Sequence, residues 1–344
     1  MLNALKSEPA DEISRIQLRQ MIMGYQISRC VWVAAKLGIA DLLEDGPKSI
    51  GELATATRTQ ATSLERFLRA LSSHGVLAVD RQKRFSLTPI GNLLRRGEKH
   101  SLWAAAVYWG EQWIWEPWGN LLYSLQTGAP AFDRIHGVTF FEFLAQIPDA
   151  GHVFDQFIAE GLHTHPTAVI RAHDFSQSSV IADVGGGQGA MLAEILKASP
   201  KARGILFDRP HVIEGARARL AEAGVIDRCR LVPGNFFETV PNGADTYLLS
   251  QIIHDWADEP ASAILRNCRQ AMDANSKLLL VEQVLDALHP APATALLDLT
   301  MLAILGGKER TGAEYDWLLT QADLRLSRII PTSSPFCIIE AVAG

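Results

Sequence analysis

The chain has 344 residues, of which 48% are hydrophobic and 20% are charged, and its formal net charge is −6. This length and apolar content allow a large core, favour two domains over one and exclude extensive disorder. The negative balance argues against a protein dominated by affinity for nucleic acid. Four widely spaced cysteines form no CxxC pair and no zinc spacing, and no apolar stretch reaches the roughly 18 residues of a membrane span. We therefore expect a cytoplasmic protein with reduced thiols, no bound metal and no membrane partner.

The first segment, residues 10–46, predicts helix. Apolar residues such as Ile13, Ile16 and Met21 recur at roughly helical spacing, and glycines stand where helices would end. The apolar content is high for a helix that faces water. We expect this surface to pack against something else, such as a second copy of the chain.

Residues 47–100 predict a winged helix-turn-helix, because two short helices precede a charged hairpin around Arg81–Arg84. The segment carries ten Lys or Arg against four Asp or Glu. A DNA-binding regulator would use such a basic stripe, here Arg66, Arg69, Arg81, Lys83 and Arg84. A run of charge is more often a solvated face, so regulation is the weaker hypothesis.

Aromatic-rich helix is expected over residues 105–175, and β-rich runs alternate with helical stretches from Ser179 onward. The runs with strand composition are SVIADVGG, RGILFD, CRLVPGNF, DTYLLSQII and KLLLVEQVL, and the chain closes with a hairpin. This alternation predicts an α/β fold with a mostly parallel sheet covered on both faces. Because ligands bind at the carboxyl ends of such strands, the residues that follow each strand form the candidate site.

The first strand runs into the glycine-rich segment DVGGGQG. Glycines there let a ligand approach the backbone, but Gly185-x-Gly187-x-Gly189 is not the dinucleotide fingerprint GxGxxG. Asp183 precedes these glycines, and an acid is a poor neighbour for phosphate and a good one for an ammonium group. The alternative is a tight turn between a strand and a helix, with no ligand.

Polar and aromatic side chains also follow the second and third strands. The carboxylate of Asp208 can accept both hydroxyls of a ribose, although a helix N-cap is the alternative. Asn235 can hydrogen-bond an adenine edge, and Phe236 can cover its face. These residue types together favour a nucleoside-like ligand.

His254 follows the fourth strand, and Glu282 lies inside the apolar fifth strand. A carboxylate in so apolar a run is unfavourable to bury without a partner, and a histidine at the neighbouring strand end is a reasonable one. A single histidine at a strand end is more often structural. The surrounding motifs favour a catalytic role.

Taken in order, the segments DVGGGQG, FDRPHVI, PGNFF, SQIIHDW, LVEQVL and GGKERT resemble the small-molecule O-methyltransferases. These class I enzymes use S-adenosylmethionine (SAM) and act on caffeic acid, hydroxyindoles or bacterial polyketides. The resemblance covers essentially the whole chain. It implies a mostly α-helical winged-helix dimerisation domain at residues 1–104 and a Rossmann-like SAM-dependent methyltransferase domain at 105–344, whose residues 105–175 form a helical substrate-pocket segment.

The same resemblance implies SAM as cofactor, S-adenosylhomocysteine as its product, and a homodimer. Carried over by position, it assigns His254 as the catalytic base, with Glu282 and Glu309 beside it. The candidate SAM-binding residues are Asp183, Gly185, Gly187, Asp208, Asn235, Phe236, Ser250 and Gln251. An aspartate is common at the position of Asn235, and some plant relatives have lysine at that of Ser250, so these two roles stay open.

The substrate pocket is expected to be apolar with few polar groups. Its candidate residues are Trp109, Phe140, Phe157, Met301 and Leu305. Most aromatic residues at helical spacing belong to a core, and that alternative applies to each of them.

The predicted reaction is methyl transfer to a hydroxyl of an aromatic small molecule. A neutral phenol, with a pKa near ~10, is a weak nucleophile at neutral pH, and an imidazole with the ordinary pKa of ~6.5 can take its proton. A carboxylate on the other ring nitrogen would hold the tautomer. The alternative is methylation of a heteroaromatic ring nitrogen, which needs no base.

Overall fold

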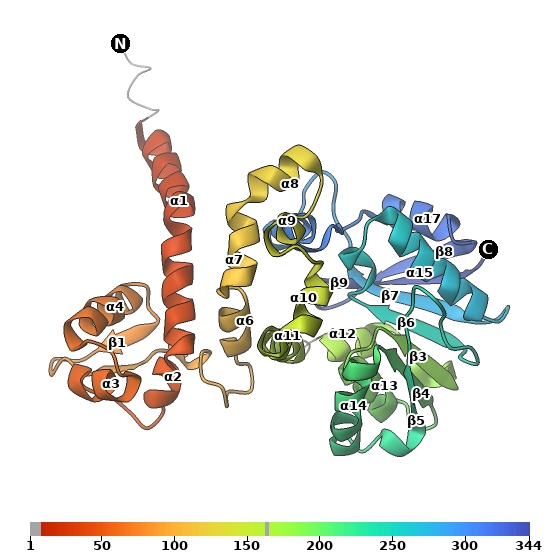
Figure 1. Ribbon diagram of the computed structural model, residues 1–344, viewed down its shortest axis with the longest axis horizontal. Coiled ribbons are helices and arrows are strands. Elements are labelled where there is room, and N and C mark those ends of the chain that lie inside the picture. Colours follow the sequence, from red (N-terminus) through yellow and green to blue (C-terminus); the bar gives the residue numbers. More distant parts are fainter. Residues whose placement is uncertain (1–7, 162–164) are drawn as a thin grey trace, which may run out of the picture. The chain divides into compact units, whose positions relative to one another are not determined.

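The structure is a computed structural model that describes residues 8–161 and 165–344 (Figure 1). The chain divides into two compact units, which we describe separately. One contains the residues up to Trp115 together with His152–Glu160, and the other contains Glu116–Gly151 and Gly161–Gly344. The sequence-based boundary between residues 104 and 105 stays a prediction. Within the described residues, every helix is too short or too polar to cross a bilayer.

The first unit is helical apart from one small antiparallel hairpin. The hairpin pairs Leu77–Val79 (β1) with Phe85–Leu87 (β2), around the charged turn where the wing was expected. Buried leucines of the helices around it, such as Leu53 and Leu68, form a separate core. The helices of this part of the chain are α1 (Glu8–Lys36), α2 (Ile39–Leu42), α3 (Ile50–Thr57), α4 (Ala61–Ser73), α5 (Pro89–Asn92), α6 (Trp103–Tyr108), α7 (Gln112–Gly119) and α11 (Pro148–Gly161).

Helix α1 presents the apolar surface that its sequence predicts. Its exposed large hydrophobic residues are Ile13, Ile16, Leu18, Met21, Ile22, Met23 and Tyr25. Met21 is the most open of them, with 77% of its surface exposed. Farther along α1, Ile27 and Val31 line an apolar hollow of about 400 Å³ together with Leu102 and Trp109. An apolar face of this size beside an apolar hollow is typical of a protein–protein contact.

The second unit is built on a seven-stranded sheet with the order β5-β4-β3-β6-β7-β9-β8. The first five strands in this order run parallel, and β9 and β8 add an antiparallel edge. The strands are β3 (Val180–Val184), β4 (Arg203–Asp208), β5 (Cys229–Pro233), β6 (Thr246–Ser250), β7 (Lys277–Gln283), β8 (Leu324–Pro331) and β9 (Phe336–Ala343). The expected α/β class and its closing hairpin are confirmed.

Helices cover both faces of this sheet, which is why β3, β6 and β7 are nearly continuous apolar runs. Residues of α15 and α17 pack on one face, and residues of α12, α13 and α14 pack on the other. The helical elements of this part of the chain are α8 (Leu121–Thr127), α9 (Ala131–His136), α10 (Phe140–Gln146), α12 (His165–Ala172), η1 (Phe175–Gln177), α13 (Ala190–Ala198), α14 (Pro210–Glu222), η2 (Ile226–Arg228), η3 (Ile253–Asp255), α15 (Asp258–Ala271), α16 (Pro292–Thr300), η4 (Met301–Leu305) and α17 (Gly312–Thr320).

Candidate active site

The predicted cofactor and catalytic residues of the second unit gather at the carboxyl ends of its parallel strands. The glycine loop follows β3, Asp208 ends β4, and Asn235 follows β5. His254 lies just beyond β6, and Glu282 is near the end of β7. This is the edge at which an open α/β sheet binds its ligand.

The glycine loop is shaped by close contacts on one side and open space on the other. Gly185 and Gly187 have φ angles of 72° and 58°. A Cβ on Gly185 would stand 2.7 Å from Ile252 Cδ1 and 3.4 Å from Phe236 Cε1, whereas a Cβ on Gly187 would meet no atom within 4 Å. The backbone at Gly187 is therefore open to a ligand. We call this open space, next to the Phe236 and Ile252 side chains that lie against Gly185, the crevice.

Two acids lie beneath this loop. Asp183 is fully buried, and within the described residues its carboxylate accepts no hydrogen bond. Burial, together with the neighbouring Asp208 carboxylate, raises the pKa of Asp183 to about 7. A Cβ on Gly186 would collide with the Asp183 carboxylate, so this side chain lies directly under the loop backbone.

Asp208 is tied to the loop by its own carboxylate. Its Oδ2 accepts the N–H of Gly187 at 2.7 Å, and its Oδ1 accepts the N–H of Arg209 at 2.7 Å. The N-cap of α14 is Arg209, not Asp208, so the helix-cap alternative does not hold. Burial raises the pKa of Asp208 as well. Neither acid is in a salt bridge within the described part of the chain, but the charge of Arg209, the next residue, acts on Asp208 and lowers its pKa against the effect of burial.

The remaining cofactor candidates have mixed surroundings. Asn235 uses its amide within its own turn, accepting from the N–H of Phe237 and donating to Glu238, each at 3.1 Å. The Ser250 hydroxyl is buried and has no hydrogen-bond partner among the described residues. Gln251 has a φ of 56°, a left-handed conformation that is rare for a non-glycine residue and that occurs preferentially at functional sites.

His254 is buried in the short turn η3, and a carboxylate lies near each of its ring nitrogens. Nδ1 is 2.7 Å from Oε1 of Glu309 and 3.9 Å from Oε2 of Glu282. Nε2 is 3.3 Å from Oδ1 of Asp255. The three predicted catalytic residues are thus together, and Asp255, the residue after His254, joins them.

The charges of this cluster change the basicity of its histidine. Burial by itself lowers the pKa of His254, but the carboxylates of Glu282, Asp255 and Glu309 outweigh it and raise the pKa to about 10. Burial raises the pKa of Glu282 to about 7 and that of Asp255 to about 6. The ordinary imidazole pKa assumed from the sequence is therefore wrong for this site, because three buried carboxylates stabilise the imidazolium.

Backbone contacts hold the members of the cluster against one another. Glu282 Oε1 accepts the N–H groups of Ile252 and Ile253, at 3.0 and 2.8 Å. The N–H of Lys308 donates to the carbonyl of His254 at 3.0 Å, next to Gly307, where a Cβ would collide with that same carbonyl. A glycine at this position is what lets the Glu309 segment lie against the His254 turn.

The predicted substrate residues are divided between the two units, with Phe140, Met301 and Leu305 in the second. Met301 and Leu305 belong to η4, a π-helical turn that contacts the His254 turn η3. Such turns occur frequently at functional sites. Phe140 is buried to 2% exposure and packs edge-on against Phe132 and Phe141, as a core residue does.

Trp109 and Phe157 belong to the first unit. Phe157 stacks on Tyr108 with ring centroids 4.2 Å apart, and Trp109 packs edge-on against both rings. Trp109 also lines the apolar hollow beside α1. The substrate roles of the five candidates stay predictions.

Several residues of the site carried no catalytic signal in the sequence. Trp256 packs against Phe141 and Phe237, and the Arg209 guanidinium lies over the Phe141 ring, which places Phe141 of α10 near the crevice. Arg310 is fully buried directly after Glu309. In the sequence, Arg310 is distinguished only by its place next to Glu309 in the segment GGKERT.

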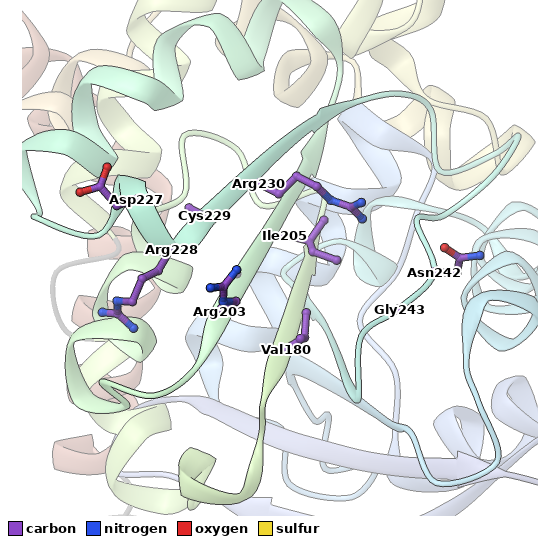
Figure 2. Close-up of a pocket in the computed structure, with 10 residues that line it drawn as sticks. Val180, Arg203, Ile205, Asp227, Arg228, Cys229, Arg230, Asn242 and Gly243 are labelled. Carbon is purple, nitrogen blue, oxygen red and sulfur yellow. The ribbon is translucent and has the colours of Figure 1, made fainter.

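The second unit also has a hollow at the amino ends of its parallel strands, opposite the candidate site (Figure 2). It has a volume of about 480 Å³ and is lined by the first residues of β3, β4 and β5, Val180, Arg203 and Cys229. The guanidinium of Arg228 there donates to the carbonyls of Leu196, Ser199 and Ala202 and so caps α13. Amino ends of parallel strands are not where such sheets bind ligands, so this hollow is not a candidate active site.

Comparisons with known proteins give the class of this fold and site. A family model described as an O-methyltransferase domain matches residues 118–325, and one described as an O-methyltransferase dimerisation domain matches residues 19–97. The phenazine O-methyltransferase PhzM of Lysobacter antibioticus is 44% identical over 94% of this chain and 95% of its own length. The phenazine-1-carboxylate N-methyltransferase of Pseudomonas aeruginosa is 34% identical over 91% of this chain and 92% of its own length.

A solved structure of the O-methyltransferase NcsB1 from neocarzinostatin biosynthesis, in complex with SAM and 2-hydroxy-5-methyl naphthoic acid, is 32% identical. It covers 92% of this chain and 96% of its own, with a TM-score of 0.82. The fold is that of a SAM-dependent methyltransferase. The chain belongs to the O-methyltransferase family, with an N-terminal dimerisation domain.

The crevice beside the glycine loop fits SAM chemically. SAM carries a positive sulfonium and a positive ammonium group, and the crevice lies over two buried acids, Asp183 and Asp208, that form no salt bridge among the described residues. The open backbone at Gly187 and the aromatic wall of Phe236 suit a nucleoside. In the described part of the chain, no group of three or more His, Cys, Asp or Glu residues is arranged to hold a metal ion.

Proposed function

We propose that this protein transfers the methyl group of SAM to a hydroxyl oxygen of an aromatic small molecule, with His254 as the general base. The contact that carries the proposal is the 2.7 Å pair between His254 Nδ1 and Glu309, because it leaves Nε2 as the nitrogen available to an acceptor. The 44% identity to a phenazine O-methyltransferase makes hydroxylated phenazines the first substrate class to test.

SAM, when bound, supplies the electrophilic methyl carbon. We propose that the glycine loop and Asp208 hold it, with Asp208 accepting the ribose hydroxyls and Phe236 bounding the adenosine. Asp183 is covered by the loop backbone, so its contribution is the negative charge that it places under the crevice. The loop and the acids thus act on binding and orientation.

Proton transfer is the chemical step that the protein's own side chains perform. The acceptor hydroxyl donates its proton to His254 Nε2, where Asp255 Oδ1 is the present neighbour at 3.3 Å. Glu309 then holds the imidazolium through Nδ1, and Glu282 adds a second negative charge at 3.9 Å. The neighbouring carboxylates raise the pKa of His254, so its neutral form is a stronger base toward a phenol than an ordinary imidazole, and this form is present once the imidazolium has released its own proton.

Methylation of a ring nitrogen is the second candidate function, because the family includes the phenazine-1-carboxylate N-methyltransferase. A ring nitrogen with a free electron pair needs no base. The buried cluster around His254 favours the oxygen acceptor, since a histidine held between carboxylates is suited to take up a proton, and a hydroxyl must lose one whereas such a ring nitrogen need not.

We also propose that the protein is a homodimer held through its N-terminal unit. The exposed apolar face of α1 and the apolar hollow beside Ile27 and Val31 support this, as does the match to a dimerisation domain over residues 19–97. Light scattering of the full chain measures the mass directly, and a monomer at micromolar concentration would contradict this proposal.

The experiment that tests the reaction uses methyl-labelled SAM with hydroxyphenazines, phenazine carboxylates and hydroxynaphthoates, and locates the label on oxygen or nitrogen by NMR. His254→Ala is expected to lower turnover by about 10²–10⁴-fold while SAM still binds. His173→Ala is the matched control, because His173 is another buried histidine, with Nδ1 3.8 Å from Glu340, at the other end of the sheet. Label on nitrogen, or full turnover of His254→Ala, would overturn the proposal.

A further inference from the structure

Arg310 carries a charge that the proposed chemistry does not use. Its side chain is fully buried, and a buried guanidinium is tolerated only where its donors are satisfied. The backbone of Arg310 pairs with the end of β7, since its carbonyl accepts the N–H of Leu285 at 2.9 Å and its residue bridges Val284. Arg310 is therefore anchored to the strand that also carries Glu282.

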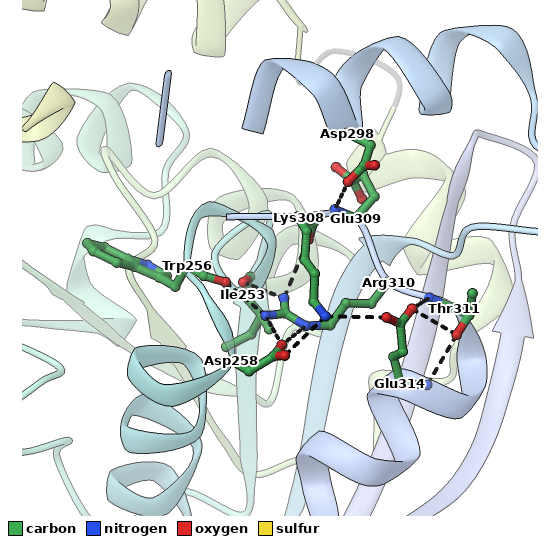
Figure 3. Close-up of polar contacts among 9 residues, drawn as sticks. All are labelled: Ile253, Trp256, Asp258, Asp298, Lys308, Glu309, Arg310, Thr311 and Glu314. Carbon is green, nitrogen blue, oxygen red and sulfur yellow. Dashed lines mark hydrogen bonds and ion pairs between the residues drawn. The ribbon is translucent and has the colours of Figure 1, made fainter. Parts of the chain in front are cut away.

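The guanidinium hydrogen-bonds to the turn that carries His254 at two points, one before and one after His254 in the chain (Figure 3). Nη1 donates to the carbonyl of Ile253 at 3.0 Å, and Nη2 donates to the carbonyl of Trp256 at 2.8 Å. These two residues directly flank His254 and Asp255. The carbonyl of Ile253 also accepts the N–H of Trp256 at 3.3 Å within η3, so Arg310 is a second donor to it and, through the Trp256 carbonyl, joins the two ends of the turn.

Asp258 holds the guanidinium in that position. Its Oδ1 accepts from Nε and Nη2 of Arg310, at 3.1 and 2.8 Å, and its Oδ2 pairs with Lys308 Nζ at 3.0 Å. Asp258 is the first residue of α15, so the pair also fixes where the helix begins. The cations on either side of Glu309 thus both reach the same carboxylate, as Figure 3 shows.

Glu309 points the other way. Along an extended segment the side chains alternate, so Lys308 and Arg310 project to Asp258 while Glu309 projects to His254. The N–H of Glu309 donates to Asp298 Oδ1 at 2.9 Å, which fixes its backbone as well. The position of Glu309 relative to His254 is set by these contacts, because the 2.7 Å contact between the two side chains joins segments 55 residues apart.

We propose that Arg310, held by Asp258, is a positioning residue that sets the contact between Glu309 and His254. This inference rests on the proposed function of His254, and it concerns geometry instead of chemistry. Lysine cannot replace Arg310, because a single ammonium group cannot reach two carbonyls and a carboxylate in the fixed directions of a guanidinium fork.

The test compares Arg310→Gln, Arg310→Lys, Asp258→Asn and the control Lys308→Met in the full chain. Arg310→Gln and Arg310→Lys are expected to lower turnover by ~10–100-fold with the SAM dissociation constant unchanged, as misplaced catalytic groups do. Asp258→Asn should act in the same direction and more weakly. Lys308→Met removes a cation from the same carboxylate and keeps the backbone N–H that donates to the His254 carbonyl, so it should lose less turnover than Asp258→Asn.

The pKa of His254, followed by NMR of protein labelled at the histidine carbon between the ring nitrogens, separates positioning from charge. Loss of a nearby cation alone would raise this pKa in Arg310→Gln. Loss of the Glu309 contact would lower it, and that decrease is the expected result. Asp258→Asn, whose side chain is 39% exposed, carries the test if Arg310→Gln does not fold.

Three outcomes would overturn the inference: a raised His254 pKa in Arg310→Gln, full turnover in Arg310→Lys, or equal losses in Asp258→Asn and Lys308→Met. None of them bears on the proposed base, which fails only if His254→Ala retains turnover. The titration of His254 is read without substrate or SAM, so the two failures are distinguishable.

Discussion

Two groups of buried acids lie at the carboxyl ends of the same sheet and are neutralised in different ways. Asp183 and Asp208 lie under the glycine loop with no ion pair among the described residues. The acids around His254 surround its imidazole, and the buried Arg310 donates hydrogen bonds to the same turn. The first group forms no salt bridge among the described residues, and the positive groups of SAM would complement its charge. The second holds its own cation, which fits a group that must accept and release a proton in every cycle.

The largest effect is expected from removing the acid nearest to the base. Glu309→Gln keeps the shape and removes the charge 2.7 Å from His254 Nδ1, so the imidazolium loses its nearest carboxylate and the hydrogen bond that orients the ring. Turnover should fall by about 10²-fold or more, with the SAM dissociation constant unchanged. Glu282→Gln is the matched control at 3.9 Å, and it should lose less. A larger loss in Glu282→Gln than in Glu309→Gln would reverse the roles of the two acids.

The second effect concerns Asp208, one of the two acids under the glycine loop. Asp208→Asn removes the charge that holds Gly187 and that we propose accepts the ribose hydroxyls. Hydrogen bonds to charged groups contribute about 1.5–3 kcal/mol, so SAM should bind about 10–100-fold more weakly in calorimetry. The pKa of His254 should not move. If SAM affinity is unchanged and the His254 pKa shifts, the two acid groups are not independent.

The third effect is a displacement of the pH profile. His254 accepts a proton only when neutral, and its raised pKa means that turnover should rise with pH toward about 10. Asp255→Asn removes a carboxylate 3.3 Å from Nε2 that helps to raise that pKa. The rising limb should therefore move to lower pH, measured as turnover from pH 6 to 10 at saturating SAM. A limb that moves to higher pH would contradict the assigned electrostatics.

The smallest effect is on the stability of the protein without SAM. The pKa of Asp183 is raised from 3.8 to about 7, so the folded state favours its protonated form. This contribution to stability is fully present below pH 3.8 and is lost as the pH rises through about 7. Asp183→Asn should remove that part of the pH dependence of the melting temperature between pH 5 and 8. An unchanged dependence would show that other groups dominate it.

The sequence was sufficient for the elements and for the order of the chemical groups along the sheet. Apolar runs such as VIADV and KLLLVEQ predict buried strands, and glycines or acids at their ends mark the ligand edge. The base and its two acids were found because Glu282 is an anomaly in an apolar strand and because the motif order resembles a family. Each of these signals is local, or is a pattern of local signals.

Tertiary structure decided what these groups do to one another. Burial in one cluster raised the pKa of His254, a sum over three carboxylates that no linear pattern contains. Asp255 lies 3.3 Å from His254 Nε2, because the short turn η3 directs these two consecutive side chains toward the same site. Arg310 donates to the carbonyls on either side of His254 because the segment that carries Glu309, 55 residues farther along the chain, folds against the His254 turn. Distances across a fold, not residue types, set electrostatic energies.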